Sequence, residues 1–300
     1  MKTFRSAFAC ACALVSVGQT FAIPRSEAGK NDAPIDTKYF HEPGHDDYLG
    51  HYDQRYFKEK VSYEEREDTL HHMIRAYLNA FREKGLETWI AHGTLLGWWW
   101  NEKILPWDWD LDTQVSGATL AYLGEHENMT THRYTSEDGQ VQREYLLDVN
   151  PWVWERERGD GNNIIDARWI DLRNGLFIDI TGLSETRPDA FPGIWVCKNY
   201  HRYRTVDLYP LRESSYEGVP VLVPYAYEKL LTEEYKSKAL VVTEYEGHRW
   251  DAHSKEWLKN SNQQHVLSAR ELSHSHSPRS IQTRSNRPGL RNIFRLLGGL

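Results

Sequence analysis

The stretch from Trp89 to Asp112 reads W-I-A-H-G-T-L-L-G-W-W-W-N-E-K-I-L-P-W-D-W-D-L-D, and the expected fold follows from it. Residues 88–91 predict a short apolar strand, and residues 93–100 predict a turn that enters a short helix. Residues 107–115 alternate acidic and apolar side chains, as a strand with one polar face would. This strand–helix–strand order favours a sheet flanked by helices.

The acidic run places a carboxylate at every second position. Because residues i and i+2 of a strand point to the same face, Asp108, Asp110 and Asp112 are expected to line one side, with Trp109 and Leu111 facing the core. Like charges this close are costly unless a cation neutralises them. Mg²⁺ and Mn²⁺ prefer carboxylate oxygens and often bridge substrate phosphates, so the run predicts a metal site. The alternatives are a solvated acidic face or a calcium-binding loop, although the ligand spacing of an EF-hand is absent.

The glycine turn just upstream strengthens the metal hypothesis. A glycine at a strand-to-helix turn lets backbone N–H groups approach a phosphate, and a helix N-terminus favours negative charge. We therefore expect Gly93 and Thr94 to bind a donor phosphate beside a metal ion held by Asp110 and Asp112.

A further carboxylate interrupts the apolar run of residues 176–181. Because an isolated buried charge is expensive, Asp179 is predicted to be a metal ligand or a base that faces the acceptor hydroxyl. The alternative is a carboxylate at a strand edge that is capped by a backbone amide. Asp171, on the neighbouring predicted strand, is a second candidate for the same role. Such acids beside a phosphate turn suit in-line displacement at phosphorus.

Basic residues near the predicted hairpin could meet a phosphate. Arg168 could bind the donor phosphate through its forked guanidinium group, or it could form a structural ion pair with Asp166 or Asp171. A second basic cluster is expected to lie on the solvated surface and consists of His201, Arg202 and Arg204.

The rest of the chain supplies helices and strands around these motifs. Ser62 and Glu65 form a capping-box pattern at the start of a helix that Gly85 ends. Residues 145–149, 169–172, 176–181 and 219–223 are predicted strands; Asn174-Gly175 predicts a hairpin between the middle two, and a helix ending near Tyr235 follows the last. The order of elements predicts an α/β (α+β) fold, with a mixed sheet flanked by helices.

The chain divides into four predicted segments. Residues 1–22 have the basic start, apolar run and small residues of a secretory signal peptide, with an uncleaved signal anchor as the alternative. Residues 23–60 form an irregular arm, residues 61–260 the catalytic domain, and residues 261–300 a basic tail expected to be disordered. Removal of the leader would leave Cys197 as the sole thiol; we expect it to be a buried apolar residue rather than a nucleophile.

The amino-acid composition indicates which kinds of molecule the chain is expected to bind. The formal net charge of −7 argues against a nucleic-acid partner, because such proteins present basic surfaces to phosphates. The 12 Trp and 17 Tyr suit sugar or nucleobase stacking, but most are expected to fill the core. Asn128-Met129-Thr130 is an N-glycosylation sequon, usable if the chain enters the secretory lumen.

These motifs resemble a known family. The run from Trp89 to Asp112 resembles the signature of the LicD/fukutin family. Residues 160–183, D-G-N-N-I-I-D-A-R-W-I-D-L-R-N-G-L-F-I-D-I-T-G-L, are similar to its fungal branch, which is associated with mannosylphosphate transfer. Residues 219–235 are similar to its C-terminal element, so the resemblance covers roughly residues 60–245. It implies a nucleotidyltransferase-like fold with a central mixed sheet flanked by helices.

The resemblance also implies roles for single residues. It assigns the phosphate turn to Gly93 and Thr94, the paired metal ligands to Asp110 and Asp112, and the third carboxylate to Asp179. Asp108 matches the first acid of the run. Family members transfer phosphocholine, ribitol phosphate or, as proposed for the fungal branch, mannose phosphate, from CDP-linked donors or GDP-mannose. Bacterial members often have a basic residue after the glycine turn and Asp where this chain has Trp109, and this departure makes choline the less secure candidate for the transferred group.

Three hypotheses follow from the sequence. The first is a Mg²⁺- or Mn²⁺-dependent phosphosugar transferase of the secretory pathway, in the Golgi or ER lumen or secreted, which acts on a glycan. The second is an inactive regulator or accessory subunit of another transferase. The third is a secreted glycan-binding module. Membrane contact is expected only through an uncleaved leader or the C-terminal tail.

Overall fold

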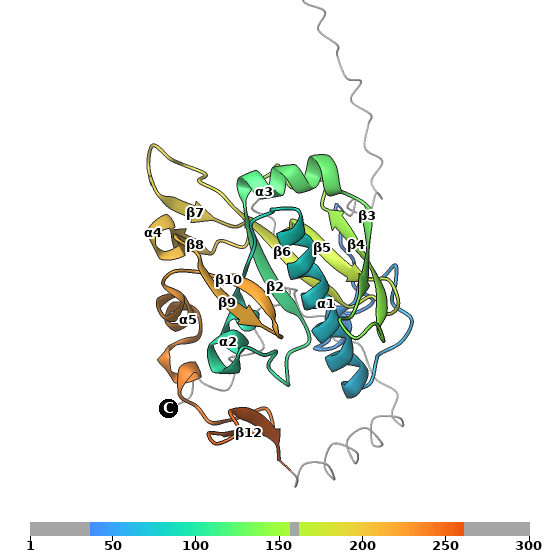
Figure 1. The fold of residues 1–300 in the computed structure, drawn as a ribbon. Helices are drawn as coiled ribbons and strands as arrows, with labels where there is room; N and C mark the ends of the chain where they lie inside the picture. Colours follow the sequence, from blue (N-terminus) through green and yellow to red (C-terminus); the bar gives the residue numbers. More distant parts are fainter. Residues whose placement is uncertain (1–36, 157–161, 261–300) are drawn as a thin grey trace, which may run out of the picture. The chain divides into compact units, whose positions relative to one another are not determined.

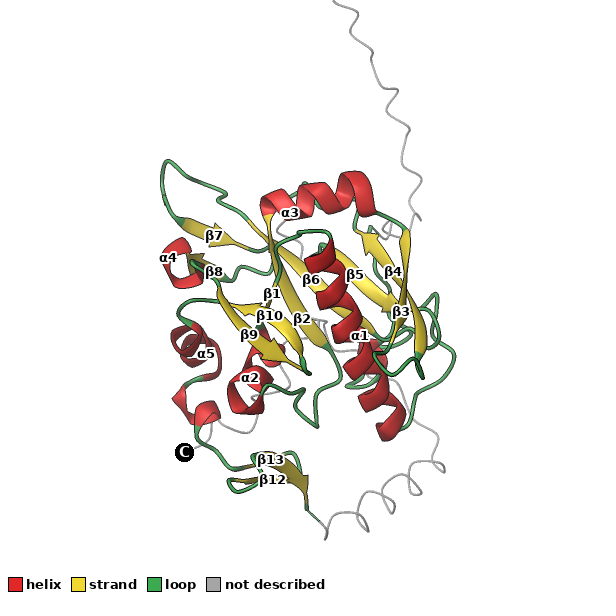
Figure 2. Ribbon diagram, in the orientation of Figure 1, coloured by secondary structure: helices red, strands yellow, loops and turns green. Residues whose placement is uncertain are grey.

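The computed structural model describes residues 37–156 and 162–260, and its central element is a six-stranded sheet (Figures 1 and 2). The sheet has the order β1-β2-β6-β5-β4-β3. Its strands are β1 (Trp89–Ile90), β2 (Leu111–Ser116), β3 (Thr130–Thr135), β4 (Gln142–Val149), β5 (Ala167–Asp171) and β6 (Phe177–Leu183). β2 and β6 run parallel and all other neighbours antiparallel, so the predicted mixed sheet is confirmed.

Helix α1 (Tyr63–Glu83) lies across this sheet (Figure 2). The Oγ atom of Ser62 accepts a hydrogen bond from the backbone N–H of Glu65 at 3.2 Å, and Gly85 follows the helix with φ +67°. The predicted cap and end of the helix are therefore confirmed. Its apolar side contributes Met73, Ile74 and other residues to the core.

Smaller elements surround the sheet. The helices are α2 (His92–Asn101), α3 (Gly117–Tyr122), α4 (Thr205–Leu208) and α5 (Tyr227–Tyr235), with short 3₁₀ segments at Leu49–His51 and Ser237–Leu240 and a π-helical turn at Leu123–Glu127. The outer strands are β7 (Ile194–Val196), β8 (Arg202–Arg204), β9 (Arg212–Tyr216), β10 (Val219–Val223), β11 (Glu244–Tyr245), β12 (His248–Asp251) and β13 (Glu256–Lys259).

The predicted strand at residues 107–115 starts too early. β2 begins at Leu111, where pairing with β6 begins, and the segment before it is irregular. The backbone N–H of Asp108 bonds to the carbonyl of Leu105 at 2.9 Å, so that residue belongs to a turn. Asp108 and Asp110 therefore precede the strand, and only Asp112 of the acidic run belongs to it.

The hairpin of β5 and β6 is confirmed. Gly175 has φ +85°, a conformation that favours glycine, and a Cβ there would lie 2.9 Å from the carbonyl oxygen of Asp53. The backbone N–H of Asp53 donates to the carbonyl of Gly175 at 2.7 Å. Thus the described part of the N-terminal arm packs against the hairpin, and Tyr52 is fully buried there.

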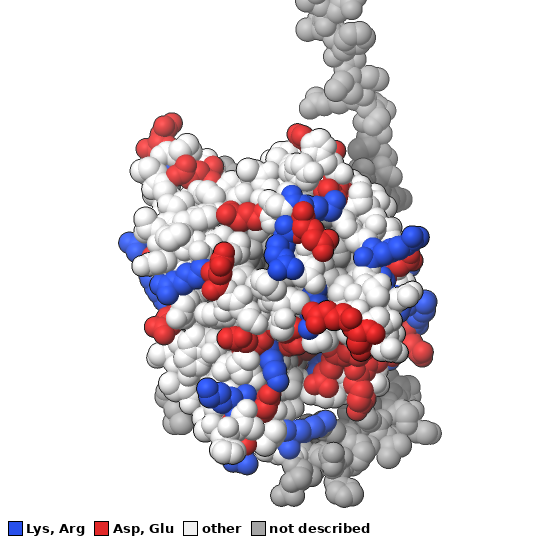
Figure 3. All heavy atoms as spheres, in the orientation of Figure 1, with Lys and Arg blue, Asp and Glu red and all other residues white. Residues whose placement is uncertain are grey.

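Several expectations fall outside the described residues, namely the leader, the first part of the arm and the basic tail. None of the described helices is long and apolar enough to cross a membrane. On the face drawn in Figure 3, Lys and Arg side chains are interspersed with Asp and Glu. Among the described residues, seven of the twelve largest fully buried side chains are aromatic, and they include Trp89, Trp169 and Tyr145.

Candidate active site

The parallel pairing of β2 with β6 brings two of the predicted acids together. In this register Asp112 lies opposite Asp179, and their flanking residues Leu111 and Ile178 are fully buried in the core. Side chains at paired positions of neighbouring strands point to the same face. Asp112 and Asp179 therefore share one face of the sheet, with Asp110 just before it.

In most of these carboxylates, neighbouring positive charge offsets only part of the cost of burying the negative charge. Burial, followed by the charge of Asp110, raises the pKa of both Asp108 and Asp112 well above the ordinary range. Burial also raises the pKa of Asp179, against the opposing charge of Arg168. The side chains of Asp110 and Asp179 are nonetheless 30% and 14% exposed, so a ligand can reach them.

Asp110 differs because a histidine of the N-terminal arm faces it. His51 Nδ1 lies 3.5 Å from Asp110 Oδ2. Burial alone would raise the pKa of Asp110, but the charge and hydrogen bond of His51 outweigh it and lower the pKa. His51 belongs to the segment that the sequence marked only as irregular.

Arg168 is held inside the acidic site. Its Nε donates to Asp179 Oδ1 at 2.8 Å, and its Nη2 donates to Glu42 Oε1 at 2.7 Å. The guanidinium group also stacks over the Phe177 ring, 3.6 Å from its centroid, and the residue is 3% exposed. Arg168 therefore orients the Asp179 carboxylate, whatever else it binds.

The sequence-based prediction that Arg168 pairs with Asp166 or Asp171 is wrong. Asp166 is instead held by Arg156 at 2.7 Å and by Lys198 at 2.9 Å. Asp171 lies at the hairpin end of β5 and accepts a hydrogen bond from the backbone N–H of Arg173 at 2.7 Å. Neither acid competes for Arg168, because β5 directs that side chain to Asp179, its partner on β6.

The glycine turn supports the acidic run. A Cβ on Gly93 would lie 2.9 Å from Asp108 Oδ2, so the missing side chain makes room for that carboxylate. The Oγ1 atom of Thr94 accepts a hydrogen bond from the backbone N–H of Asp112 at 2.8 Å. Both residues thus position the acids at the N-terminal end of α2, where a phosphate would meet the positive end of the helix.

His92, the first residue of α2, is a further site residue that sequence reasoning missed. Its Nδ1 lies 2.6 Å from Glu234 Oε1 of α5, and its ring centroid lies 4.7 Å from that of His201. Burial lowers the pKa of His92, but the charges of Glu234, Asp112 and Asp110 together raise it to about 9. His201 is half-buried here, so the expectation that it lies on the solvated surface is wrong.

The other members of that basic cluster behave as expected. Arg202 and Arg204 are exposed, and Arg204 pairs with Asp207 at 2.8 Å. The expectation for Cys197 is also confirmed, since it is buried and burial raises the pKa of its thiol.

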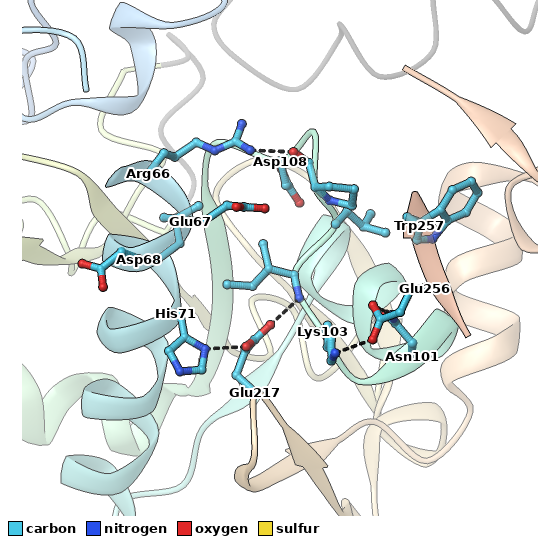
Figure 4. Close-up of a pocket in the computed structure, with 14 residues that line it drawn as sticks. Arg66, Glu67, Asp68, His71, Asn101, Lys103, Asp108, Glu217, Glu256 and Trp257 are labelled. Atoms are coloured by element: carbon cyan, nitrogen blue, oxygen red, sulfur yellow. Dashed lines mark hydrogen bonds and ion pairs between the residues drawn. The ribbon is translucent and has the colours of Figure 1, made fainter. Parts of the chain in front are cut away.

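A polar cavity of about 440 Å³ adjoins the acidic run at Asp108 (Figure 4). It lies between α1, the segment after α2, the β9–β10 turn and β13. Glu217 in its wall accepts a hydrogen bond from the backbone N–H of Ile104 at 2.7 Å and contacts His71 Nδ1 at 2.6 Å. Figure 4 shows Trp257 on the opposite side from these groups. Trp257 is itself only 9% exposed and packs against Trp100 and Trp107, so polar groups form most of the open wall.

Glu42 and His51 carried no local signal in the sequence. Glu42 lies 126 positions from Arg168, and His51 stands in an irregular segment without periodicity. Their roles depend on the packing of the arm against the β5–β6 hairpin.

Comparison with known proteins agrees with this fold and motif order. Residues 85–226 match the family described as LicD/FKTN/FKRP, nucleotidyltransferase domain. These residues therefore resemble a LicD-family domain. The matched residues include the glycine turn, the acidic run and both strands that carry Asp112 and Asp179.

Two relatives from Saccharomyces cerevisiae (strain ATCC 204508 / S288c) support the fungal branch of the family. Mannosyltransferase regulator 4 is 35% identical over 167 residues, which cover 52% of this chain and 14% of that protein. Mannosyltransferase regulator 14 is 37% identical over 121 residues, which cover 40% of this chain and 13% of that protein. The chain thus spans a small part of the length of these relatives.

The donor set of the acidic site fits a hard divalent cation. Asp108, Asp110, Asp112 and Asp179 offer only carboxylate oxygens, the ligands that Mg²⁺ and Mn²⁺ prefer. Burial first, and repulsion by Asp110 second, raise the pKa values of Asp108 and Asp112. A bound cation would remove this repulsion.

Proposed function

We propose that this domain transfers a phosphate-linked group, specifically a sugar phosphate such as mannose phosphate, from a nucleotide-activated donor to a glycan. The observation that carries the proposal is the register of β2 and β6, which places Asp112 opposite Asp179. Asp108 and Asp110 immediately precede β2 in the sequence and so lie at the same end of the strand pair. The similarity to the LicD family and to two proteins named mannosyltransferase regulators supports a role in glycan modification.

The chemistry would be displacement at the phosphorus that bears the transferred group. A bond forms from the acceptor hydroxyl oxygen to that phosphorus, and the bond from phosphorus to the bridging oxygen of the nucleotide breaks, releasing a nucleoside monophosphate. A Mg²⁺ or Mn²⁺ ion, held by Asp110, Asp112 and Asp179, supplies neutralisation of the phosphate charge when it is bound.

The chain's own residues bind and orient the reactants. The N-terminal end of α2, at Gly93 and Thr94, would bind the donor phosphate. Arg168 fixes the Asp179 carboxylate through the 2.8 Å contact, and that carboxylate ligates the metal or takes the proton of the acceptor hydroxyl. The cavity beside Asp108 offers room for a sugar.

Binding of donor to the purified full-length chain tests this proposal. GDP-mannose and CDP-choline are titrated with Mn²⁺ and then with EDTA, and the released nucleotide and the modified glycan are detected by mass spectrometry. We expect one donor to bind only with metal and to lose at least 10-fold in affinity in Asp110→Asn. The matched control Asp138→Asn alters an exposed carboxylate outside the site and should bind as the wild type does. Absence of metal-dependent binding of either donor would contradict the proposal.

A regulatory role is the second candidate, and the names of the two yeast relatives favour it. A regulator of this kind would stimulate another mannosyltransferase without transferring phosphate itself. Asp110→Asn separates the two functions: stimulation in cells that survives the substitution supports regulation, whereas loss of glycan phosphate supports catalysis.

We also propose that the protein acts in the lumen of the secretory pathway, the setting that the predicted leader indicates. Its partners would be the nucleotide-activated donor and the glycan acceptor, with no nucleic acid. Fractionation of cells that express a tagged full-length chain tests this placement.

A further inference from the structure

A second cluster of possible metal ligands stands beside the carboxylate site. It consists of His92 at the start of α2, His201 in the turn between β7 and β8, and Glu234 of α5. One donor atom from each residue lies within 4.8 Å of the others. The three residues come from distant parts of the sequence, and only the packing of α5 and of the β7–β8 turn against α2 brings them together.

The donor spacing is close to what a tetrahedral ion needs. Ligand atoms of such an ion lie about 3.3 Å apart, given zinc–ligand bonds of about 2.0–2.2 Å. The outer limit of 4.8 Å exceeds this spacing, whereas His92 Nδ1 and Glu234 Oε1 lie only 2.6 Å apart, so ion binding would need small rotations that separate this pair and draw His201 in. His92 itself has φ +51°, a rare conformation for a residue other than glycine, and such strain concentrates at functional positions.

A neighbouring group holds one of the imidazoles in place. His201 Nδ1 lies 3.5 Å from the Sγ atom of Cys197, at the base of the same turn. A histidine whose Nδ1–H is held in this way presents its Nε2 for coordination, and such outer contacts orient metal-bound histidines. Cys197 is buried and is not one of the three residues of the cluster.

The chemistry of the ligands differs between the two sites. Two imidazole nitrogens and one carboxylate oxygen are a common zinc ligand set that leaves a fourth position open, whereas the acidic site offers only oxygens. The imidazole ring of His92 is buried, but the Glu234 side chain is 25% exposed, so solvent reaches the cluster on that side.

We propose that His92, His201 and Glu234 bind a zinc-class divalent cation at a site separate from the carboxylates. The fourth position would hold water or an anionic group of a bound ligand. Since His92 directly precedes Gly93, this ion would lie next to the proposed phosphate turn. The site does not depend on the proposed transfer reaction, because its ligands are distinct from the carboxylates.

Zinc binding to the full-length chain tests the proposal without reference to activity. The protein is stripped with EDTA, desalted, and titrated with Zn²⁺ by calorimetry, and bound metal is counted by elemental analysis. We expect one zinc per chain, with affinity at least 10-fold lower in His201→Gln and in Glu234→Gln. Asp110→Asn and the exposed-site control His253→Gln should retain it.

Other outcomes would overturn the proposal. The first is that the wild-type protein binds no zinc at about 10 µM free metal, a concentration far above the dissociation constants of protein zinc sites. The second is that both cluster variants bind zinc with unchanged affinity. The third is that only Asp110→Asn loses zinc. Circular dichroism and Mn²⁺ binding show whether a variant is folded. If the variants do not fold, zinc-edge X-ray absorption of the wild-type complex decides, because two imidazoles with oxygen are expected and an all-oxygen shell would contradict the site.

Discussion

Asp112 and Asp179 are paired in the sheet but differ in what surrounds them. The Asp179 carboxylate has the buried guanidinium of Arg168 at 2.8 Å. Asp112 faces the charges of Asp110 and Asp179, with His92 as its cationic neighbour, and its pKa is raised well above the ordinary range. Burial raises the pKa of both acids, but Asp179 has a guanidinium group in direct contact, whereas the charges of Asp110 and Asp179 raise the pKa of Asp112 further.

We expect Asp112→Asn to raise the melting temperature of the metal-free protein and to abolish stabilisation by Mn²⁺. The amide removes a charge whose burial and repulsion are worth on the order of 1 kcal/mol for each unit of pKa shift. Mn²⁺ would otherwise stabilise the folded state by binding to it alone. Thermal denaturation in EDTA and in Mn²⁺ measures both effects.

The matched variant is Asp179→Asn, which removes the partner of Arg168. This change should lower the melting temperature in EDTA, because a buried guanidinium group loses one of its two carboxylates. Equal destabilisation by both substitutions would show that Asp112 is as well compensated as Asp179.

At the scale of elements, α1 depends on its N-terminal cap. The Oγ atom of Ser62 satisfies the backbone N–H of Glu65, one of the donors that a helix start leaves unpaired. We expect Ser62→Ala to lower the free energy of unfolding by about 1 kcal/mol. Ser62→Asp, which keeps an acceptor and suits the helix dipole, should cost little. Urea denaturation of the two variants measures the difference.

The edge strand β3 makes stability depend on pH. His132 packs against Trp169 with the rings tilted by 37° and their centroids 4.6 Å apart, and burial, aided by Lys84, lowers the pKa of His132. Its folded-state pKa thus lies below the unfolded value of about 6.5. The unfolded chain binds the proton more readily. The contribution of His132 to the free energy of unfolding is therefore fully present above about pH 6.5 and is lost as the pH falls through the folded-state pKa.

His132→Phe should remove this dependence while retaining a ring contact with Trp169. As the pH falls below about 6.5, the free energy of unfolding of the wild type should decrease by up to about 1.4 kcal/mol more per pH unit than that of the variant. Urea denaturation at several pH values measures this difference, with the exposed-site variant His126→Phe as control. Parallel curves for wild type and His132→Phe would contradict the assignment.

At the scale of the whole molecule, the described part of the N-terminal arm, from residue 37 onward, packs with the β5–β6 hairpin around the acidic site. Glu42 and His51 of the arm contact Arg168 and Asp110, and Asp53 bonds to the hairpin turn. The arm therefore completes the electrostatic surroundings of the carboxylates.

We expect Glu42→Ala to lower the free energy of unfolding by about 1.5–3 kcal/mol, the range for hydrogen bonds to charged groups. Amide hydrogen exchange should become faster across the arm, including the N–H of Gln54 that bonds to the His41 carbonyl. Glu59→Ala, at an exposed position of the same segment, is the control. Unchanged exchange in Glu42→Ala would show that the arm is held without this contact.

Local sequence patterns predicted several of the elements and indicated the family. The cap at Ser62 and the periodicity after it located α1, the Asn174-Gly175 pair located the hairpin, and residues 219–223 matched β10. These features depend on interactions between residues a few positions apart, and a short stretch of sequence is enough to predict such interactions. The long motif from Trp89 to Asp112 was specific enough by itself to indicate the LicD family.

Tertiary structure alone decided which side chains meet. The β2–β6 register placed Asp112 opposite Asp179, the arm brought His51 to Asp110, and three separate elements gathered His92, His201 and Glu234. Strand β2 also began later than the alternation of residues 107–115 predicted, because pairing with β6 starts only at Leu111. Contacts between distant residues depend on packing and strand register, for which a single sequence carries no local signal.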